Sequence, residues 1–156
     1  MVFTWHDYNP EKMGFIEKWL DADAVATTGM DEGFRNFYEY WLKEDGFILG
    51  QNFWCKIACA DKEPLAVVAF NLYQGKVTIM EIVVAPEKRG RGIGSTILKE
   101  LMQNKHISGL TIGKCEAAIY TNNIASQKAF EHAGFQHFHT HEDGDTLYYL
   151  YERDHE

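Results

Sequence analysis

Apolar and polar residues alternate with a period of two in several short runs of the chain, and this alternation is typical of β-strands. The first run is VFTWHDY, residues 2–8. Three more runs, 53–60, 65–73 and 77–84, are separated only by the short polar links DKEP and QGK. Links this short join antiparallel neighbours. The pattern therefore predicts one early strand and a three-stranded antiparallel meander.

Other segments carry apolar residues three and four positions apart, which is the spacing of one helix face. A first helix is predicted after Asn9-Pro10, because asparagine caps helices and proline suits the first turn. A polar segment at 27–29 follows, and aromatic residues then predict a second helix over about 31–43. A third amphipathic stretch, 93–102, comes directly after a loop rich in glycine and arginine. This loop therefore lies between a strand and a helix.

The last third of the chain repeats the two patterns. Residues 114–120 predict a strand, and a helix is expected between its asparagine cap, Asn123, and its stop at Gly134. The strands 135–141 and 146–152 are joined by EDGD, which contains a favoured Asp-Gly hairpin turn. The predicted order is β-α-α-β-β-β-α-β-α-β-β. It describes an α/β chain of the α+β type with a mixed, largely antiparallel central sheet flanked by helices.

Composition limits the classes of protein that the chain can be. Its 156 residues, 46% of them hydrophobic, suit a single domain over 1–156. No apolar run approaches the roughly 20 residues that span a bilayer, and no secretory signal pattern is present, so we expect a cytoplasmic protein that does not bind membranes. Its formal charge of −8 opposes nucleic-acid binding and attracts cationic amines. Cysteines 55, 59 and 115 lack the spacing of a zinc or redox pair and are predicted to be reduced.

The loop before residue 93 has the chemistry of a phosphate site. Its glycines at 90, 92 and 94 leave backbone N–H groups accessible at the positive end of a helix dipole. Arg89 and Arg91 add side chains that suit phosphate oxygens. The alternative is a tight turn with solvated arginines. A P-loop would require a lysine that GRGIGST lacks, and a Rossmann fingerprint belongs to a parallel βαβ unit, whereas hairpin-linked strands precede this loop.

Two sequence motifs, which follow each other along the chain in the family's order, resemble those of the Gcn5-related N-acetyltransferase (GNAT) superfamily. The run 89–94, RGRGIG, matches the acetyl-CoA signature Arg/Gln-x-x-Gly-x-Gly/Ala and follows the strand end Val84-Ala85-Pro86. The run 123–126, NIAS, resembles a second family motif, with Phe130 and then Gly134-Phe135 behind it. The resemblance spans residues 77–135, and the element order of the rest of the chain is also similar to that family.

The resemblance implies that acetyl-CoA is the cosubstrate and lies between splayed fourth and fifth strands. The positions that match the family's acetyl-CoA site are Ile82, Val83, Val84, Arg89, Gly90, Arg91, Gly92, Ile93, Gly94, Ser95, Asn123, Ser126 and Phe130. The implied reaction is direct attack of a primary amine, in a small molecule or a peptide, on the thioester. A backbone N–H of the fourth strand, such as that of Val83, would polarise the carbonyl oxygen.

The catalytic residues depart from the commonest family pattern. Phe130 stands where the family usually has a tyrosine acid, and Ala118 where some relatives have a glutamate base. Glu81, an acid among apolar strand residues, is our candidate base, and a solvated or ion-paired carboxylate is the alternative. Tyr120 is our candidate acid, with Tyr148 or Tyr149 as substitutes.

Several features leave alternatives open. His137, His139 and His141 are predicted to share one strand face, which is either an exposed polar face or a metal-ligand spacing; we predict no metal. The aromatic residues of 34–41 fit a core or an amine site. The acids that surround them, which would suit a cationic amine, are Asp21, Asp23, Asp31, Glu32, Glu39, Glu44 and Asp45. A non-catalytic acyl-CoA sensor and a different nucleotide binder are the rival functions, and the oligomeric state, a homodimer included, is open.

Overall fold

The computed structural model describes residues 3–47, 52–104, 107, 109, 111–153, without the side chains of 44–47. The elements are β1 (Thr4–Asp7), the 3-10 helix η1 (Gly14–Trp19), α1 (Ala22–Thr28), α2 (Phe34–Phe47), β2 (Asn52–Ala60), β3 (Glu63–Tyr73), β4 (Lys76–Val84), the 3-10 turn η2 (Pro86–Lys88), α3 (Ile93–Gln103), β5 (Lys114–Tyr120), α5 (Ile124–His132), β6 (Gln136–Thr140) and β7 (Thr146–Glu152). No helix within these ranges is long and apolar enough to cross a membrane.

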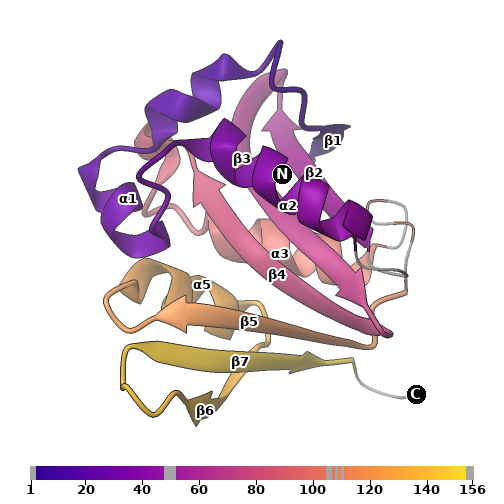
Figure 1. The fold of residues 1–156 in the computed structure, drawn as a ribbon, viewed down its shortest axis with the longest axis vertical. Coiled ribbons are helices and arrows are strands. Elements are labelled where there is room, and N and C mark those ends of the chain that lie inside the picture. The colour runs from indigo at the N-terminus through magenta and orange to yellow at the C-terminus, as the bar shows by residue number, and fades with distance from the viewer. Residues whose placement is uncertain (1–2, 48–51, 105–106, 108, 110, 154–156) are drawn as a thin grey trace.

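The described strands form one seven-stranded sheet in the order β1-β2-β3-β4-β5-β7-β6. Neighbouring strands are antiparallel except β4 and β5, which are parallel. The predicted meander is β2-β3-β4, and the predicted mixed, largely antiparallel sheet is confirmed. The single parallel pair arises because α3 carries the chain back across the sheet between β4 and β5 (Figure 1).

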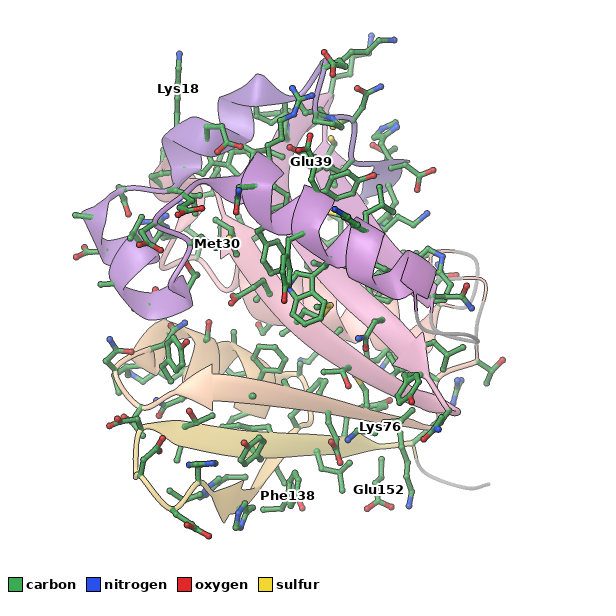
Figure 2. The ribbon with its side chains drawn as sticks, in the orientation of Figure 1. Lys18, Met30, Glu39, Lys76, Phe138 and Glu152 are labelled. Carbon is green, nitrogen blue, oxygen red and sulfur yellow. The ribbon has the colours of Figure 1, made fainter. Side chains whose placement is uncertain are left out.

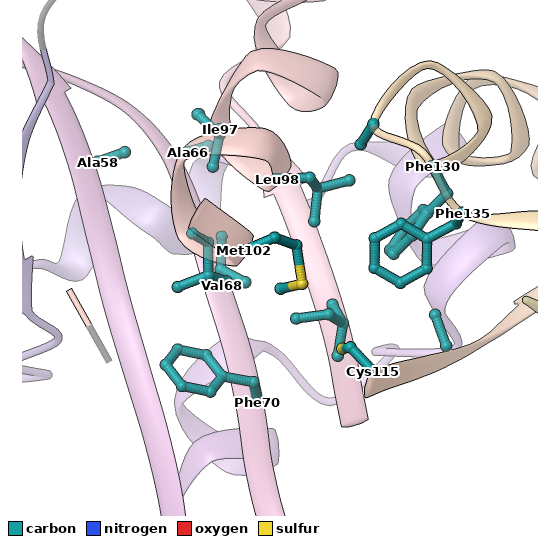
Figure 3. Close-up of a cluster of buried hydrophobic side chains, with 14 of the residues drawn as sticks. Ala58, Ala66, Val68, Phe70, Ile97, Leu98, Met102, Cys115, Phe130 and Phe135 are labelled. Carbon is teal, nitrogen blue, oxygen red and sulfur yellow. The ribbon is translucent and has the colours of Figure 1, made fainter. Parts of the chain in front are cut away.

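Helices cover both faces of the sheet. On one face α3 and α5 pack against the larger core cluster, in which Val68 and Phe70 of β3 lie beneath Leu98 and Met102 (Figure 3). On the other face η1 and α2 pack over Ile57, Val67 and Val83. Alternation along β3 explains this, because successive residues point to opposite faces and both faces are buried.

The predicted first helix begins later than its cap and is not α-helical. Asn9 does start a turn, since its carbonyl accepts hydrogen bonds from the N–H groups of Lys12 and Met13 at 3.1 and 2.9 Å. The chain then continues as the 3-10 helix η1, and Asn9 and Pro10 precede it. The sequence was right about the turn signal and wrong about where the helix starts.

The segment that looked like a polar connection is the helix α1. Asp21 caps it by accepting the Ala24 N–H at 2.9 Å, and Gly29 ends it in the left-handed conformation with φ of 75°. Only Ala24 is buried in its seven residues. Hydrophobic periodicity therefore could not detect α1, whereas its two caps could have.

The second predicted helix, over about 31–43, is shifted to Phe34–Phe47. Its first N–H groups, those of Phe34 and Arg35, donate to the Glu17 carboxylate at 2.8 and 3.0 Å. Gly33 lies so close to Glu17 that a Cβ there would be 2.5 Å from Oε1. The helix start is thus set by a side chain from η1, a long-range contact that local patterns do not contain.

The three histidines near the C-terminus do not share a face, contrary to our expectation. A bulge lies between His137 and His139, which pair with the adjacent residues Tyr149 and Tyr148. Because adjacent residues of a strand point to opposite faces, the bulge directs the two imidazoles apart. His141 follows the end of β6, lies with His139 against the ring of Tyr148, and contacts Asp143 at 3.2 Å, so only His137 departs from the expected shared face. No group of potential metal ligands forms among the described residues.

Candidate active site

The cleft of the molecule begins where β4 and β5 separate. Their parallel ladder has three pairs and ends at Ile79 and Ala117. At the same point Met80 is an extra residue of β4, because Glu81 pairs with Ala69 of β3 and Ile79 with Phe70. The two strands then diverge, and α1 lies at the open end between them (Figure 1). The bulge and the end of the ladder together open the sheet.

A cleft of about 160 Å³ fills this opening. One wall is β4, the other is β5 with α5 and its cap, and one residue each comes from α1 and β7. The lining residues are Thr27, Ile79, Met80, Glu81, Ile82, Ala117, Ala118, Ile119, Tyr120, Asn123, Ser126, Phe130 and Thr146. Residues of the second sequence motif therefore face β4, the strand that leads toward the glycine loop.

Glu81 is an ionisable group in a mostly apolar wall of the cleft. It pairs with Ala69, which belongs to the core cluster beneath η1 and α2, so its side chain leaves β4 on that face. Burial raises the pKa of its carboxyl to about 8. This explains how a glutamate can be accommodated here, since at neutral pH it is mainly the uncharged acid.

The opposite wall contains the other predicted residues. Tyr120 is 45% exposed at the end of β5, and a Cβ on Gly29 of α1 would lie 3.6 Å from its hydroxyl oxygen. Asn123 caps α5 by accepting the Ser126 N–H at 3.1 Å. Phe130 is buried and meets Phe135 edge-on at 4.9 Å between ring centroids.

Of the tyrosines considered as an acid, Tyr120 is the one in the cleft. Tyr149 donates its hydroxyl to Glu131 at 2.9 Å, and burial with that bond raises its pKa to about 12. Tyr148 stacks on His139 and does not line the cleft. Ala118 also lines the cleft, where its methyl group offers no ionisable group.

The glycine loop forms the start of α3. Gly90 and Gly92 have φ of 76° and 74°, which non-glycine residues adopt at a cost. The first intrahelical bond runs from Thr96 N–H to the Gly92 carbonyl, so the N–H groups of 93–95 have no intrahelical acceptor. The Ser95 hydroxyl donates to the same carbonyl at 3.0 Å. Ser95 thus offers its N–H, rather than its hydroxyl hydrogen, to an anion.

Gly94 brings α3 close to α5. A Cβ at this position would be 3.4 Å from that of Ala129 and 3.9 Å from Val84 Cγ2. Its φ is not positive, so the requirement here is space and not backbone conformation. The third glycine of the motif therefore joins the loop to the helix that carries Asn123 and Phe130.

The side chain of Arg89 does not extend from the loop as our sequence analysis expected of a phosphate ligand. Its Nε donates to the Val84 carbonyl at 3.2 Å, and its Nη2 donates to the Trp19 carbonyl at 2.9 Å. Its Nη1 forms an ion pair with Asp21 Oδ2 at 2.8 Å. The guanidinium is satisfied by protein groups at the junction of η1 and α1. Arg91, in contrast, is exposed in the glycine loop, so its charge faces solvent.

The acids and aromatics of the N-terminal region have mixed roles. Phe34, Phe37 and Tyr38 pack in the second core cluster, while Tyr40 is exposed. Glu39 pairs with Arg35, as does Glu11. Asp21, Asp23, Asp31 and Glu32 are exposed, and the side chains of Glu44 and Asp45 lie outside the described residues. The aromatic set is mainly core, and the exposed acids leave this face negative.

Sequence reasoning missed two polar residues of the cleft. Thr27 comes from α1, which was not predicted, and its hydroxyl donates within that helix to the carbonyls of Asp23 and Ala24. Thr146 starts β7 opposite Tyr120. The caps of α1 in the sequence could have revealed the helix that carries Thr27. The pairing register of β5 with β7 could have placed Thr146 beside the cleft.

Comparison with known sequences decides the family. A model of the acetyltransferase (GNAT) family matches residues 8–135. The chain belongs to the GNAT family. No curated protein sequence is similar enough to this GNAT chain to count as a relative.

Solved structures confirm the GNAT fold. An aminoglycoside acetyltransferase, AAC(6')-Ib, in complex with paromomycin and acetyl-CoA superposes with a TM-score of 0.76 at 17% identity, covering 98% of this chain and 94% of that one. The N-acetyltransferase PseH of Campylobacter jejuni, in complex with acetyl-CoA, gives 0.67 at 13% identity, with 98% and 100% covered. A GNAT acetyltransferase of Streptococcus pneumoniae gives 0.68 at 16% identity, with 97% and 99% covered.

Proposed function

We propose that this GNAT protein is an acetyl-CoA-dependent N-acetyltransferase that acts on a primary amine. The observation that carries the proposal is the cleft between β4 and β5, because residues of the second motif there face a carboxyl of raised pKa on the strand that leads toward the glycine loop. Solved GNAT relatives hold acetyl-CoA or coenzyme A, which supports the same cosubstrate here.

The acetyl-CoA site would consist of the glycine loop and the two diverging strands. Unpaired N–H groups of 93–95 and the exposed Arg91 suit the pyrophosphate. Beyond Ile79 and Ala117 neither strand pairs with the other, so Ile82, Val83 and Val84 can accept an extended arm beside them. Asn123, Ser126 and Phe130 form the facing wall. Bound acetyl-CoA would supply an acetyl group as a thioester, which an amine displaces from sulfur.

Glu81 would take the proton that the amine loses. A primary amine arrives mainly protonated at neutral pH, and a carboxylate whose pKa is close to 8 is a better proton acceptor than an ordinary glutamate. The nearby positive charge of the incoming ammonium favours the ionised form of Glu81. The uncharged amine then forms the C–N bond as the C–S bond breaks, its nitrogen loses a second proton to solvent, and Tyr120 regains from solvent the proton that it gives to sulfur.

The remaining groups would act on the carbonyl oxygen and the leaving sulfur. Val83 pairs with Val67, and the Ala85 N–H two residues later donates to the Leu65 carbonyl, so the Val83 N–H points toward β3 and not into the cleft. The N–H that we assign to the developing oxyanion is therefore that of Ile82, on the opposite edge of β4. Tyr120 would return a proton to the sulfur, since Phe130 has none to give. The products are the N-acetylated amine and coenzyme A. A thiol of pKa near 8.5 also leaves as thiolate, so Tyr120 assists rather than decides the rate.

The acceptor is proposed to be a small cationic amine. The net charge of −8 and the exposed acids around α1 favour a positive substrate. Solved structures with this fold include an aminoglycoside acetyltransferase with kanamycin or ribostamycin bound. Aminoglycosides and amino sugars are therefore the first acceptors to test.

Phe130 and Ala118 support one other candidate, a non-catalytic acyl-CoA-binding module. They stand at the positions where GNAT enzymes often carry an acid and a base. Such a module would bind acetyl-CoA without turnover.

Two measurements separate the candidates. Thermal unfolding with acetyl-CoA, coenzyme A, NAD and ATP tests the cosubstrate: only the first two should raise the melting temperature, and a ligand at 100 times its Kd contributes about 2.7 kcal/mol. Thiol release with a panel of aminoglycosides, amino sugars and polyamines then tests turnover. Stabilisation without turnover on any amine would favour the binding module, and no selective stabilisation would contradict both.

A further inference from the structure

We propose that Arg89 is a positioning residue for the amine acceptor: its guanidinium ties the glycine loop to Asp21, and Asp21 fixes the start of α1 beside the cleft. The proposal rests on the proposed function and extends it to the control of acceptor binding. It differs from the phosphate-ligand role that the sequence motif suggests for an arginine at this position.

The contacts of Arg89 support this assignment. Three nitrogens of one side chain donate to three separate protein groups, the carbonyls of Val84 and Trp19 and the carboxylate of Asp21. Val84 ends β4, and Trp19 ends η1. A planar guanidinium is suited to holding several acceptors in a fixed arrangement. Arg89 thus connects the cleft strand, the glycine loop and the N-terminal segment.

Asp21 transmits this connection to α1. Its Oδ2 accepts from Arg89 Nη1 at 2.8 Å, and its Oδ1 accepts the Ala24 N–H at 2.9 Å. The bond from Ala24, with that from Arg89, holds the pKa of Asp21 below its ordinary value, so the carboxylate is charged at neutral pH. The helix cap and the ion pair share one carboxylate.

Helix α1 depends on such polar contacts for its position, because it contributes little to the core. Only Ala24 of its seven residues is buried. Its other end is held by Asn122, whose side-chain amide donates to the Ala26 carbonyl at 3.2 Å. Directly after the second attachment, Thr27 lines the cleft and Gly29 lies against Tyr120. A change in the Arg89–Asp21 pair therefore moves the acceptor side of the cleft.

The connection also predicts that the two substrates influence each other. Acetyl-CoA would bind the loop that begins at Arg89, and α1 borders the space left for the amine. If loop ordering fixes α1, acetyl-CoA or coenzyme A must tighten amine binding, and the amine must tighten theirs by the same factor.

The test compares Arg89→Ala with Asp21→Asn, the double variant and the control Lys88→Ala. Asparagine caps helices as well as aspartate does, so Asp21→Asn removes the charge for Arg89 and keeps the acceptor for Ala24 N–H. Lys88 is a neighbouring cation whose described ion pair is to Glu63, away from α1. The readouts are KM for each substrate and amide hydrogen exchange in α1 with and without coenzyme A.

Arg89→Ala should raise KM for the amine by about tenfold, within the roughly 5–150-fold range of typical site coupling, with a smaller change in KM for acetyl-CoA. Asp21→Asn should act in the same direction, and the double variant should be no worse than Arg89→Ala, because both remove one contact. Exchange in α1 should be faster in both single variants, and Lys88→Ala should match the wild type.

The proposal is overturned if Arg89→Ala raises mainly KM for acetyl-CoA, or if the two single effects multiply in the double variant. Should Arg89→Ala fail to fold, Asp21→Asn, an exposed substitution, gives the same test. Hydrogen exchange needs no turnover. If α1 exchanges faster in the variants but the protein acetylates no amine, the contact between Arg89 and α1 is supported and the proposed function is contradicted. If the enzyme is active and α1 exchange is unaltered in the variants, the proposed function is supported and the positioning role is contradicted.

Discussion

At the scale of single residues, the candidate site depends on the Glu81 carboxyl, whose pKa is raised by its buried surroundings. Glu81 has no ion-pair partner among the described residues, and burial alone raises its pKa to about 8. In contrast, most other acids near the cleft are exposed or ion-paired. Glu81 is therefore the group through which pH acts on both activity and stability.

Replacing Glu81 by Gln should lower kcat/KM for the amine by about 100-fold, a typical loss for a general base. In the wild type the rate should rise with pH through a pKa near 8, and in Glu81→Gln this rise should be absent. Steady-state kinetics over pH 6–10 would check this. An unchanged rate and profile would show that Glu81 is not the base.

The same substitution should change how stability depends on pH. The folded-state pKa of Glu81 is raised to about 8 from a model-compound value of 4.5, so between these values the native state binds more protons than the unfolded state. The free energy of unfolding of the wild type therefore falls as pH rises through this window. Relative to wild type, Glu81→Gln should gain stability between pH 5 and pH 9. Equal melting-temperature differences at both pH values would indicate an ordinary pKa.

Tyr120→Phe tests the candidate acid, which is exposed enough to be changed without loss of packing. We expect kcat to fall by less than about tenfold, because a thiol is already an adequate leaving group. KM for acetyl-CoA should stay the same. If kcat of Tyr120→Phe equals that of the wild type, the proton given to the leaving sulfur comes from solvent and not from Tyr120.

At the scale of elements, the close approach of α3 and α5 links the glycine loop to the second motif. Gly94→Val would place branched carbons against Ala129, which is 3.4 Å from the Cβ position. Overpacking of this kind costs about 1–3 kcal/mol, so the melting temperature should fall by several degrees and acetyl-CoA binding should weaken.

Gly113→Val is the matched control, because no atom lies within 4 Å of a Cβ at that position and its φ is not positive. Differential scanning calorimetry with and without coenzyme A would compare the two. Equal destabilisation by both substitutions would mean that helix contact is not the reason for glycine at 94.

The elements also show what the sequence could and could not predict. Strands such as 114–120 and 146–152 were located to the residue because their alternation reflects a local pattern of burial. α1 was missed because it buries a single side chain, and the start of α2 was misplaced because Glu17, distant in sequence, caps it. The contacts of Arg89 could not be predicted for a related reason. A sequence motif identifies which residue is present, but the groups that its side chain contacts depend on how distant segments fold together.

At the scale of the whole molecule, the negative charge should act on cationic substrates from a distance. Exposed charges are screened within a Debye length of about 8 Å at physiological ionic strength. KM for a polycationic aminoglycoside should therefore rise as salt increases from 20 to 500 mM, while KM for acetyl-CoA, an anion, should not rise in parallel. Salt-independent KM for the aminoglycoside would argue against electrostatic attraction to the acids around α1.

The two ends of the molecule differ in the side chains that they expose, one apolar and the other charged. Phe138 projects from the edge strand β6 with 52% of its surface exposed, whereas Lys18 extends into solvent at the opposite end (Figure 2). The homodimer that the sequence left open stays a prediction, and analytical ultracentrifugation of the wild type would answer it.

The extra residue in β4, Met80, has a consequence for how this protein can change. It divides the strand into 76–79, which keeps its pairing with β5, and 81–84, which has no such neighbour. A shift in one half can be absorbed at the bulge before it reaches the other. The cleft half still belongs to the core, because Val83 is buried in one cluster and Ile82 and Val84 pack against the other. The bulge therefore lets β4 part from β5 while the strand stays paired with β3 along its length.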